Sequence, residues 1–153
     1  MLSAYLWEIG SVEQAQEMTM IQGSCSCGAV RFELSEPPKM MGTCHCTRCR
    51  KMGASVMVFV THESFRLTHG QDMITTLEAS PPYIYNRTFC SRCGTALGEI
   101  GSEAPSFPIV ANCLDDDPGI RNGFHEFTSE KPAWIEIGDD APQFEKHPLG
   151  AND

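Results

Sequence analysis

The segment "TCHCTRCRKMG", residues 43–53, places three cysteines within six positions. Three thiols cannot all pair in one disulfide. Three sulfur ligands are also one fewer than a closed tetrahedral zinc site requires. The other cysteines of the chain decide how this segment is to be interpreted.

Four further cysteines form two pairs, and their spacing is typical of metal ligands. The pairs are a C-x-C motif at Cys25 and Cys27 and a C-x-x-C motif at Cys90 and Cys93. Two sulfurs at such spacings can reach one ion while the backbone turns around it, and zinc takes about four ligands of this kind. Glycine lies beside each cluster and allows the positive φ angles that tight turns need.

Together the two pairs provide four sulfurs, enough to close one zinc site. Cys44, Cys46 and Cys49 (the triad) are then left with an open coordination position. In another partition, the triad would take one sulfur from a pair, which would leave that pair under-coordinated. A thioredoxin-like redox pair is an alternative for the C-x-x-C motif alone, although this motif lies between strand-like segments and lacks a strand–helix context. A four-sulfur site would join distant parts of the chain and contribute folding free energy.

The residues around the triad suggest supporting roles. His45 is expected to point away from the ligand side of an extended segment, where it either contacts the ligands from outside or faces solvent. Arg48, Arg50 and Lys51 form a small basic patch in an acidic chain. Cys113 belongs to no cluster and is expected to be a small buried hydrophobe at the end of a strand.

The rest of the sequence indicates one all-β domain of 153 residues. Short apolar or alternating segments, separated by turn residues, predict strands. They cover residues 29–34, 55–60, 64–67, 73–78, 83–89, 95–100, 107–112 and 134–137. No long amphipathic helix is expected after residue 20, and the only helix expected is a single turn after Cys46. Residues 1–19 are predicted to be a loosely attached extension, 20–148 the zinc domain and 149–153 a tail. Trp134 and Phe144 are expected to pack.

Charge and hydropathy exclude several classes of function. The formal net charge of −9 disfavours sequence-independent nucleic-acid binding. No segment is apolar over the length needed to cross a membrane. The N-terminus has no basic opening of the kind that secretory signals show, so the cysteines are expected to work as thiols or metal ligands in a reducing cytoplasm.

Three segments, in this order, carry a family resemblance: "GSCSCGAVRFEL", "CHCTRCRK" and "RTFCSRCGTAL". They resemble the glutathione-dependent formaldehyde-activating enzyme family, which includes centromere protein V, and the likeness runs from about residue 22 to residue 144. The resemblance implies an Mss4-like, zinc-dependent β fold with two zinc ions per chain. One would be structural, on Cys25, Cys27, Cys90 and Cys93, and the other would lie on the triad.

The resemblance also implies an activity, the joining of glutathione and formaldehyde into S-hydroxymethylglutathione, classed as a carbon–sulfur lyase reaction. An all-thiolate zinc polarises water weakly and suits a soft fourth ligand, so the triad residues are the candidate catalytic residues and a thiol is the expected ligand. The expected partners are glutathione and a small aldehyde. Three alternatives stay open: a zinc-stabilised glutathione carrier without turnover, a protein-docking module, and a thiol sensor that releases zinc on oxidation.

Overall fold

A computed structural model describes residues 20–148, so the predicted extension 1–19 and the tail 149–153 lie outside the described residues. The described part is built mainly of short β-strands. The strands are β1 (Ile21–Ser24), β2 (Arg31–Leu34), β3 (Met40–Cys44), β4 (Val56–Thr61), β5 (Phe65–His69), β6 (Ile74–Leu77), β7 (Arg87–Cys90), β8 (Ala96–Gly98), β9 (Ser106–Val110) and β10 (His125–Glu126). The helices are α1 (Thr47–Lys51) and the 3₁₀ turns η1 (Gln71–Met73), η2 (Ala111–Cys113) and η3 (Thr128–Glu130).

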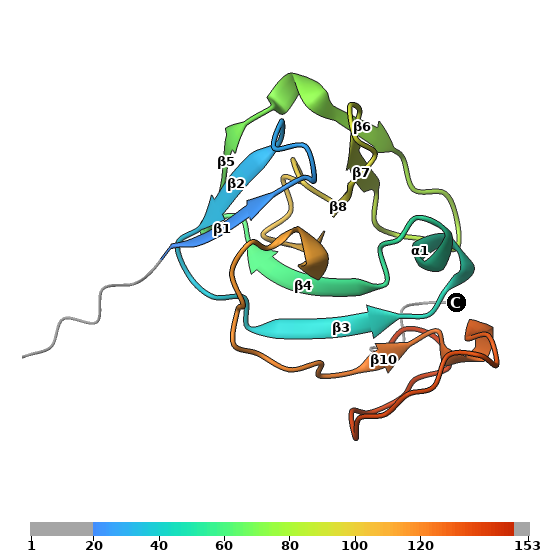
Figure 1. The fold of residues 1–153 in the computed structure, drawn as a ribbon. Helices are drawn as coiled ribbons and strands as arrows, with labels where there is room; N and C mark the ends of the chain where they lie inside the picture. The colour runs from blue at the N-terminus through green and yellow to red at the C-terminus, as the bar shows by residue number, and fades with distance from the viewer. Residues whose placement is uncertain (1–19, 149–153) are drawn as a thin grey trace, which may run out of the picture.

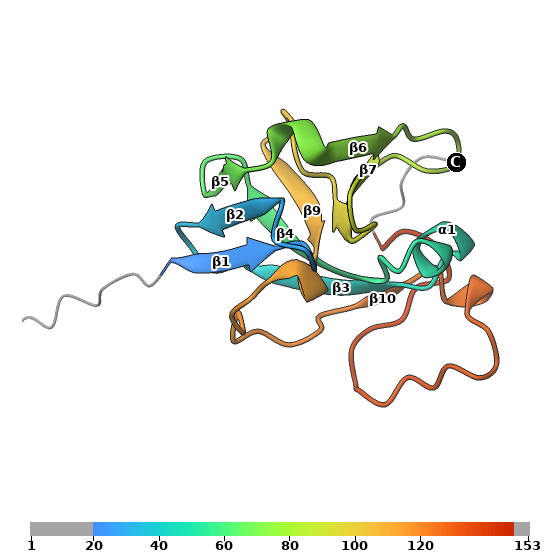
Figure 2. The ribbon, with the colours of Figure 1, turned by 45° about the horizontal axis from the view of Figure 1, so that its top comes forward.

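The strands form two sheets (Figures 1 and 2). The smaller sheet has the antiparallel order β1-β2-β5, and the larger has the order β10-β3-β4-β9-β8-β7-β6. Neighbours in the larger sheet are antiparallel except for β10, which pairs in parallel with the end of β3. Helix α1 follows directly from β3 and lies at the end of the β3–β4 hairpin (Figure 1). The pairing of β10 with β3 therefore brings the C-terminal part of the chain beside the triad segment.

One hydrophobic core joins the two sheets. Strand β2 alternates exposed and buried residues, and it contributes Phe32 and Leu34 from the smaller sheet. Val58 of β4 and Phe107 and Ile109 of β9 contribute from the larger sheet, and all five side chains are almost completely buried. Burying side chains of this size stabilises the fold by roughly 1.5–3 kcal/mol each. The core thus fixes the positions of the loops that carry the cysteines.

The predicted all-β architecture is confirmed, and so is the single helical turn after Cys46. The strand predicted at 134–137 is wrong. The segment begins in a turn, in which the Ile135 N–H donates to the Pro132 carbonyl, and residues 134–137 pair with none of the described strands. The packing role expected of Trp134 is also wrong, because its side chain is 75% exposed. Phe144 is half-buried, and its N–H donates to the His125 carbonyl of β10.

Three strands, β1, β3 and β10, were not predicted from the sequence. Strand β3 reads "MMGTC", and β10 has only two residues, so neither shows a clear alternating pattern. Pairing with β4 and the surrounding core stabilises β3 in place of local preference. No helix in residues 20–148 has the length and apolar character needed to cross a membrane.

Candidate functional site

The two cysteine pairs come together as a four-sulfur cluster. The Sγ atoms of Cys25, Cys27, Cys90 and Cys93 all lie within 4.8 Å of one another. The Sγ–Sγ distances are 3.6 Å between Cys25 and Cys27 and 3.8 Å between Cys27 and Cys90. A tetrahedral zinc with bonds of roughly 2.3 Å would space its sulfurs by about 3.8 Å. The cluster therefore fits one zinc ion, and it joins the turn after β1 to the turn after β7.

The local backbone explains how both pairs form chelating turns. Gly28 has a φ of 74° and Gly94 has a φ of 75°, in the left-handed region that glycine adopts without strain. The Val30 N–H donates to the Cys25 Sγ at 3.2 Å, a contact that favours a thiolate at this position. Cys25 is buried, whereas Cys27 is exposed.

The triad forms the second cluster, at the junction of β3 and α1. Cys44 ends β3, Cys46 is the N-cap of α1, and Cys49 lies within the helix. All three are buried, and their Sγ atoms lie within 4.8 Å of one another. The Cys46 Sγ accepts a hydrogen bond from the Cys49 N–H at 3.3 Å, so the helix cap itself fixes one sulfur. The grouping matches a division into four and three sulfurs, and no sulfur of either pair joins the triad group.

The thiols of the triad affect one another's ionisation strongly. Hydrogen bonds from Cys44 and Cys46, together with the Arg87 charge, lower the pKa of Cys49 to about 2 against the effect of burial. Hydrogen bonding with Cys46 and Cys49 raises the pKa of Cys44. Without a cation, the triad therefore forms one thiolate easily and resists forming the others. A divalent metal ion removes this conflict, since it stabilises three thiolates together.

Arg87 approaches the triad from the larger sheet. It is the first residue of β7, it is only 5% exposed, and its Nη2 donates to the Cys49 Sγ at 3.2 Å. Side chains alternate along a strand, so β7 directs Arg87 towards the triad and Cys90, three positions later, towards the four-sulfur cluster. A single strand thus contributes to both clusters.

A small hollow lies against the triad, and it has two parts that share Cys44, Tyr85, Arg87 and Glu126. The first part is also lined by Cys46, Arg48, Cys49, Tyr83, Ile84, Phe127 and His147, and the second by Gly42, Met57, Phe59, Pro108 and Phe124. Their free volumes are about 20 Å³ and about 10 Å³. Each has room for about one water-sized group. The hollow can therefore admit a very small molecule beside the sulfurs.

The basic patch predicted from the sequence is only partly at the hollow. Arg48 lines it, with its guanidinium 4.0 Å from the centre of the Tyr83 ring and its Nη1 donating to the Tyr85 carbonyl at 2.9 Å. Arg50 and Lys51 are not among the residues that line either part. Of the three basic residues, Arg48 alone is placed to meet a ligand at the triad.

An acid–base pair lies in the wall of the same hollow. Glu126 of β10 and His147 from the C-terminal segment are in contact, with 3.0 Å between the Glu126 Oε2 and the His147 Nδ1. The Phe127 ring packs edge-on against His147, with ring centroids 4.8 Å apart, and also packs against the triad. This geometry orients an imidazole towards the space beside the sulfurs.

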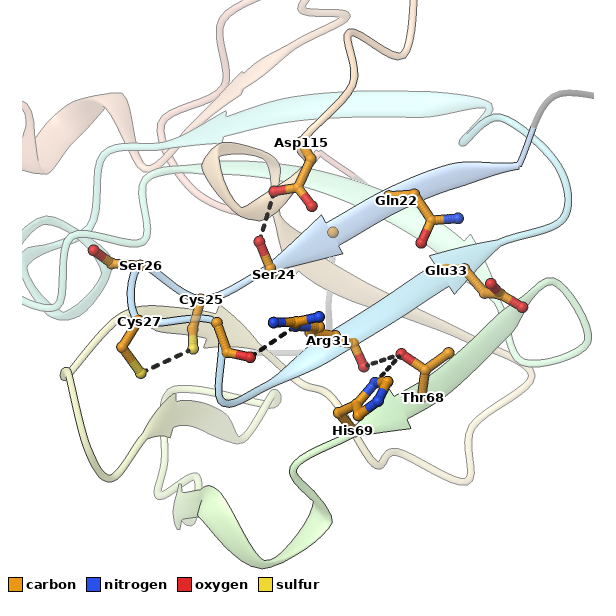
Figure 3. Close-up of a pocket in the computed structure, with 12 residues that line it drawn as sticks. Gln22, Ser24, Cys25, Ser26, Cys27, Arg31, Glu33, Thr68, His69 and Asp115 are labelled. Carbon is orange, nitrogen blue, oxygen red and sulfur yellow. Dashed lines mark hydrogen bonds between the residues drawn. The ribbon is translucent and has the colours of Figure 1, made fainter.

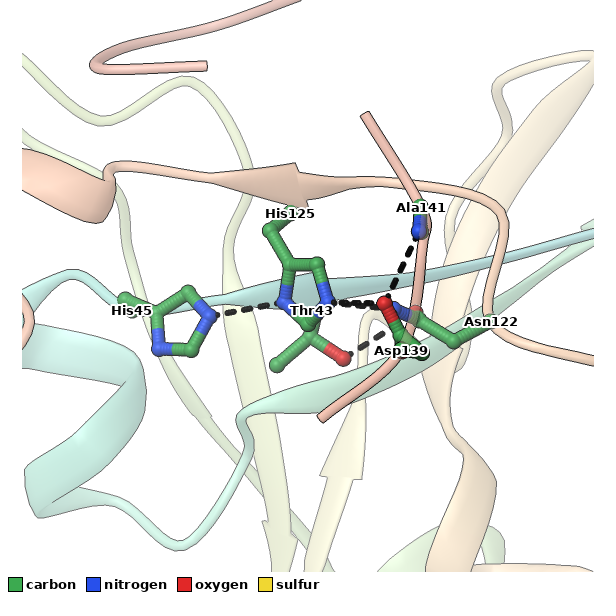
Figure 4. A network of polar contacts seen from close by, with 6 residues as sticks. All are labelled: Thr43, His45, Asn122, His125, Asp139 and Ala141. Carbon is green, nitrogen blue, oxygen red and sulfur yellow. Dashed lines mark hydrogen bonds and ion pairs between the residues drawn. The ribbon is translucent and has the colours of Figure 1, made fainter. Parts of the chain in front are cut away.

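His45 is buried, so of the two positions expected for it, outside the ligands or facing solvent, the solvent-facing one is not found. Its Nε2 lies 2.9 Å from the His125 Nδ1, and the His125 Nε2 lies 2.9 Å from the Asp139 Oδ1 (Figure 4). Asn122 contacts Asp139 and accepts a hydrogen bond from the Thr43 hydroxyl. Burial lowers the pKa of His45, and the neighbouring His125 adds to this effect. The network ties the triad turn to β10 and to the loop that carries Asp139.

The expected burial of Cys113 is confirmed. It ends η2, directly after β9, and its Sγ donates to the Ala96 carbonyl at 2.8 Å. Burial raises its pKa to about 12. Cys113 is therefore a protonated packing residue that belongs to neither cluster.

A much larger surface hollow lies elsewhere, on the smaller sheet beside the four-sulfur cluster (Figure 3), with a volume of about 600 Å³. Its polar groups largely satisfy one another. Ser24 donates to Asp115 at 2.7 Å, the Arg31 Nε donates to the Gly28 carbonyl at 2.9 Å, and Thr68 donates to the Arg31 carbonyl at 3.0 Å. None of the triad sulfurs lines this open face, so it is separate from the much smaller triad hollow.

Sequence reasoning did not identify several residues of the triad hollow. Arg87 lies inside the quoted segment "RTFCSRC", so its closeness to Cys90 was visible, but its direction towards the triad was not. Tyr83, Glu126 and His147 come from segments without any local motif. No sequence signal points to them, because only the fold brings them to the triad.

Comparisons with known proteins agree with this structure. The model of the family described as "Glutathione-dependent formaldehyde-activating enzyme" matches residues 20–130. A Halomonas elongata protein that carries the provisional name of a glutathione-dependent formaldehyde-activating enzyme is 31% identical over 127 residues, which cover 77% of this chain and 81% of that protein. A crystal structure of a Rhodobacter sphaeroides protein has a TM-score of 0.53 at 20% identity, covering 80% of this chain and 98% of that chain, and shows the same fold. The chain therefore belongs to the glutathione-dependent formaldehyde-activating enzyme family.

Proposed function

We propose that this protein is a zinc-dependent enzyme of the carbon–sulfur lyase type, which adds the thiol of glutathione to formaldehyde or another small aldehyde to form S-hydroxymethylglutathione. The observation that carries the proposal is the contrast between the two clusters: one has four sulfurs, and the other has three buried sulfurs facing a hollow. Family membership supports the same substrates. The four-sulfur cluster would hold a structural zinc.

The donor set explains why a thiol fits the open position. Zinc bound to the triad would supply a cation that favours the thiolate form of an incoming thiol. Three thiolates leave such a site with a net charge of about −1, which makes hydroxide chemistry less favourable. Arg87 and Arg48 supply positive charge at the same hollow.

The size of the hollow supports a small aldehyde as the second substrate. Free volumes of about 10 Å³ and about 20 Å³, each enough for about one water-sized group, favour the smallest aldehyde, formaldehyde, over larger ones. The tripeptide must then lie at the rim, with its sulfur directed inwards. Arg48 is the basic residue placed to meet its carboxylates.

The chain's own residues can handle the proton of the reaction. The S–H bond of the thiol breaks, a C–S bond forms, and the carbonyl oxygen gains the proton. We assign the transfer to His147, whose Nδ1 is held by Glu126 so that its Nε2 remains available. The imidazole accepts the thiol proton and returns it to the oxygen, so the reaction releases no net proton. We also infer a reducing cytoplasm as its location, because seven of the eight cysteines lie in clusters that suit a metal ion and not in disulfides.

Titration calorimetry with glutathione and S-methyl-glutathione tests the thiol part of this proposal. The proton that glutathione loses on binding should be held by His147 in the wild type and pass to the buffer in a His147→Gln variant, so two buffers of different ionisation enthalpy should give different heats for the variant. S-methyl-glutathione keeps both carboxylates but cannot form a thiolate, so it should bind much more weakly. Equal affinity for glutathione and S-methyl-glutathione, with no proton released to the buffer by the His147→Gln variant, would contradict the thiolate mechanism.

Turnover separates an enzyme from a carrier or docking module. Thiols add to formaldehyde without a catalyst, so the enzymatic rate must be compared with the uncatalysed rate over several aldehydes. The proposal expects acceleration that falls with the size of the aldehyde. Glutathione binding without any acceleration would replace the enzyme with a glutathione carrier.

A further inference from the structure

Arg87 is a buried cation in direct contact with a triad sulfur, and it has an unused donor. Its Nη1 donates to the Asn86 carbonyl at 3.0 Å and its Nη2 to the Cys49 Sγ at 3.2 Å. Its Nε is buried and has no partner among the described residues. A buried donor of this kind costs free energy unless an acceptor reaches it. Arg87 lines both parts of the hollow, where an incoming ligand would lie.

The charges around Arg87 show why this cation matters. Zinc on three thiolates carries about −1, and a fourth thiolate would raise this to about −2. A doubly negative centre is costly in a buried site, because the local dielectric is low. Arg87 touches the sulfur directly, so it compensates this charge more effectively than a cation at the surface can.

The other charged groups near Arg87 already have partners or are less able to carry a charge. Arg48 stacks on Tyr83 and is only half-buried. Glu126 is paired with His147. Glu99 does not line the hollow; burial raises its pKa, which favours its neutral form, although the Arg87 charge opposes that shift. Arg87 is therefore the fully buried cation in contact with the ligand sulfurs.

We propose that Arg87 makes the triad select an anionic fourth ligand, a thiolate, over a neutral one. It does so by balancing the charge that the thiolate adds. Its hydrogen bond to the Cys49 Sγ also withdraws electron density from that sulfur. A metal held there would then accept more electron density from the fourth ligand. Arg87 is a positioning and charge-compensating residue, and this inference rests on the proposed function.

Cobalt-substituted full-length protein tests the inference without relying on activity. Adding glutathione should increase the sulfur-to-cobalt charge-transfer absorption only at the triad, since the four-sulfur cluster has no open position. The constant absorption of that cluster reports that the variant is folded. Imidazole serves as the matched neutral ligand, and its binding is followed by the ligand-field bands.

Three substitutions complete the design. Arg87→Met removes the charge and the donors but keeps an unbranched side chain, and it should weaken glutathione binding by roughly tenfold to hundredfold, as expected for loss of a charged hydrogen bond. Imidazole binding should change little. Arg87→Lys keeps the charge without the planar fork and should lie between Arg87→Met and wild type. Arg66→Met, which removes an exposed arginine paired with Glu33 on the smaller sheet, should match wild type.

The outcomes separate the inference from the proposed function. If wild type shows no thiol-dependent absorption, the proposed function is wrong and the inference falls with it. If wild type binds glutathione and Arg87→Met binds it equally well, the inference alone is overturned. Equal weakening of glutathione and imidazole would also overturn it, because a merely structural role affects both ligands. If Arg87→Met fails to load cobalt at the triad, Arg87→Lys is used instead, and its affinity for glutathione is divided by its affinity for imidazole. A ratio lower than that of wild type supports the inference, and an equal ratio overturns it.

Discussion

Substitution of single cysteines should separate a structural zinc site from a reactive one. The most informative change is Cys27→Ser, because Cys27 belongs to the four-sulfur cluster but its side chain is exposed. Serine at this position removes a zinc ligand without opening a cavity in the core. Any large loss of stability then reports the metal cross-link and not packing.

The expected magnitude follows from the length of chain that the cluster closes. Cys27 and Cys90 are 63 positions apart in the sequence. A cross-link over a loop of this length constrains the unfolded chain by about 4 kcal/mol in the chain-entropy model. Loss of the zinc should therefore lower the free energy of unfolding by up to about 4 kcal/mol. In a chain of this size, that corresponds to a fall in Tm of roughly 8–16 °C.

Two controls define the comparison. Cys46→Ser removes a ligand of the triad but keeps a good N-cap for α1, so it should stay folded while losing thiol binding. Cys113→Ser tests a buried cysteine outside both clusters; its hydroxyl can keep the bond to the Ala96 carbonyl, and the cost should be about 1 kcal/mol. Thermal unfolding in the presence of zinc, with metal analysis of each protein, measures all three. The reasoning is refuted if Cys27→Ser is no less stable than Cys113→Ser, or if Cys46→Ser loses as much stability as Cys27→Ser.

Three further predictions follow from the site. Metal analysis should give about two zinc ions per chain, and a chelator should remove the triad zinc first; a single zinc that added metal cannot raise would contradict the triad assignment. His147→Gln should slow thiol addition by about 100-fold, with the rate measured by exchange NMR, and should leave the affinity for glutathione unchanged. An unchanged rate would exclude His147 as the proton carrier. Hydrogen bonds from His125 and from the Ala141 N–H lower the pKa of Asp139 in the folded protein. The Asp139 carboxylate should therefore stabilise the fold above about pH 4, the pKa of aspartate in the unfolded chain. This stabilisation should be lost as the pH falls through the lower pKa of the folded state. The difference in Tm between wild type and Asp139→Asn should therefore disappear in acid, and a difference that grows in acid would contradict this sign.

Much of the site was readable in the sequence because metal ligation has local rules. Two cysteines of one chelating turn must lie within a few residues of each other in the sequence. The two pairs and the triad are therefore visible as clusters in the sequence. The alternating segment 29–34 and the apolar segment 55–60 likewise predicted β2 and β4, since side-chain direction in a strand repeats every two residues.

Only the tertiary structure decided how these local units combine. Contacts between the two sheets bring Cys25 to Cys90. The three sulfurs of the triad form a separate group that includes no sulfur of either pair. Arg87 and His147 reach the triad through strand pairing and chain return, which have no local sequence pattern. The segment 134–137 has the alternation of a strand but forms none, because a strand also needs a neighbour to pair with. Local spacing determines which residues can bind a metal, whereas long-range packing determines which charges and protons surround it.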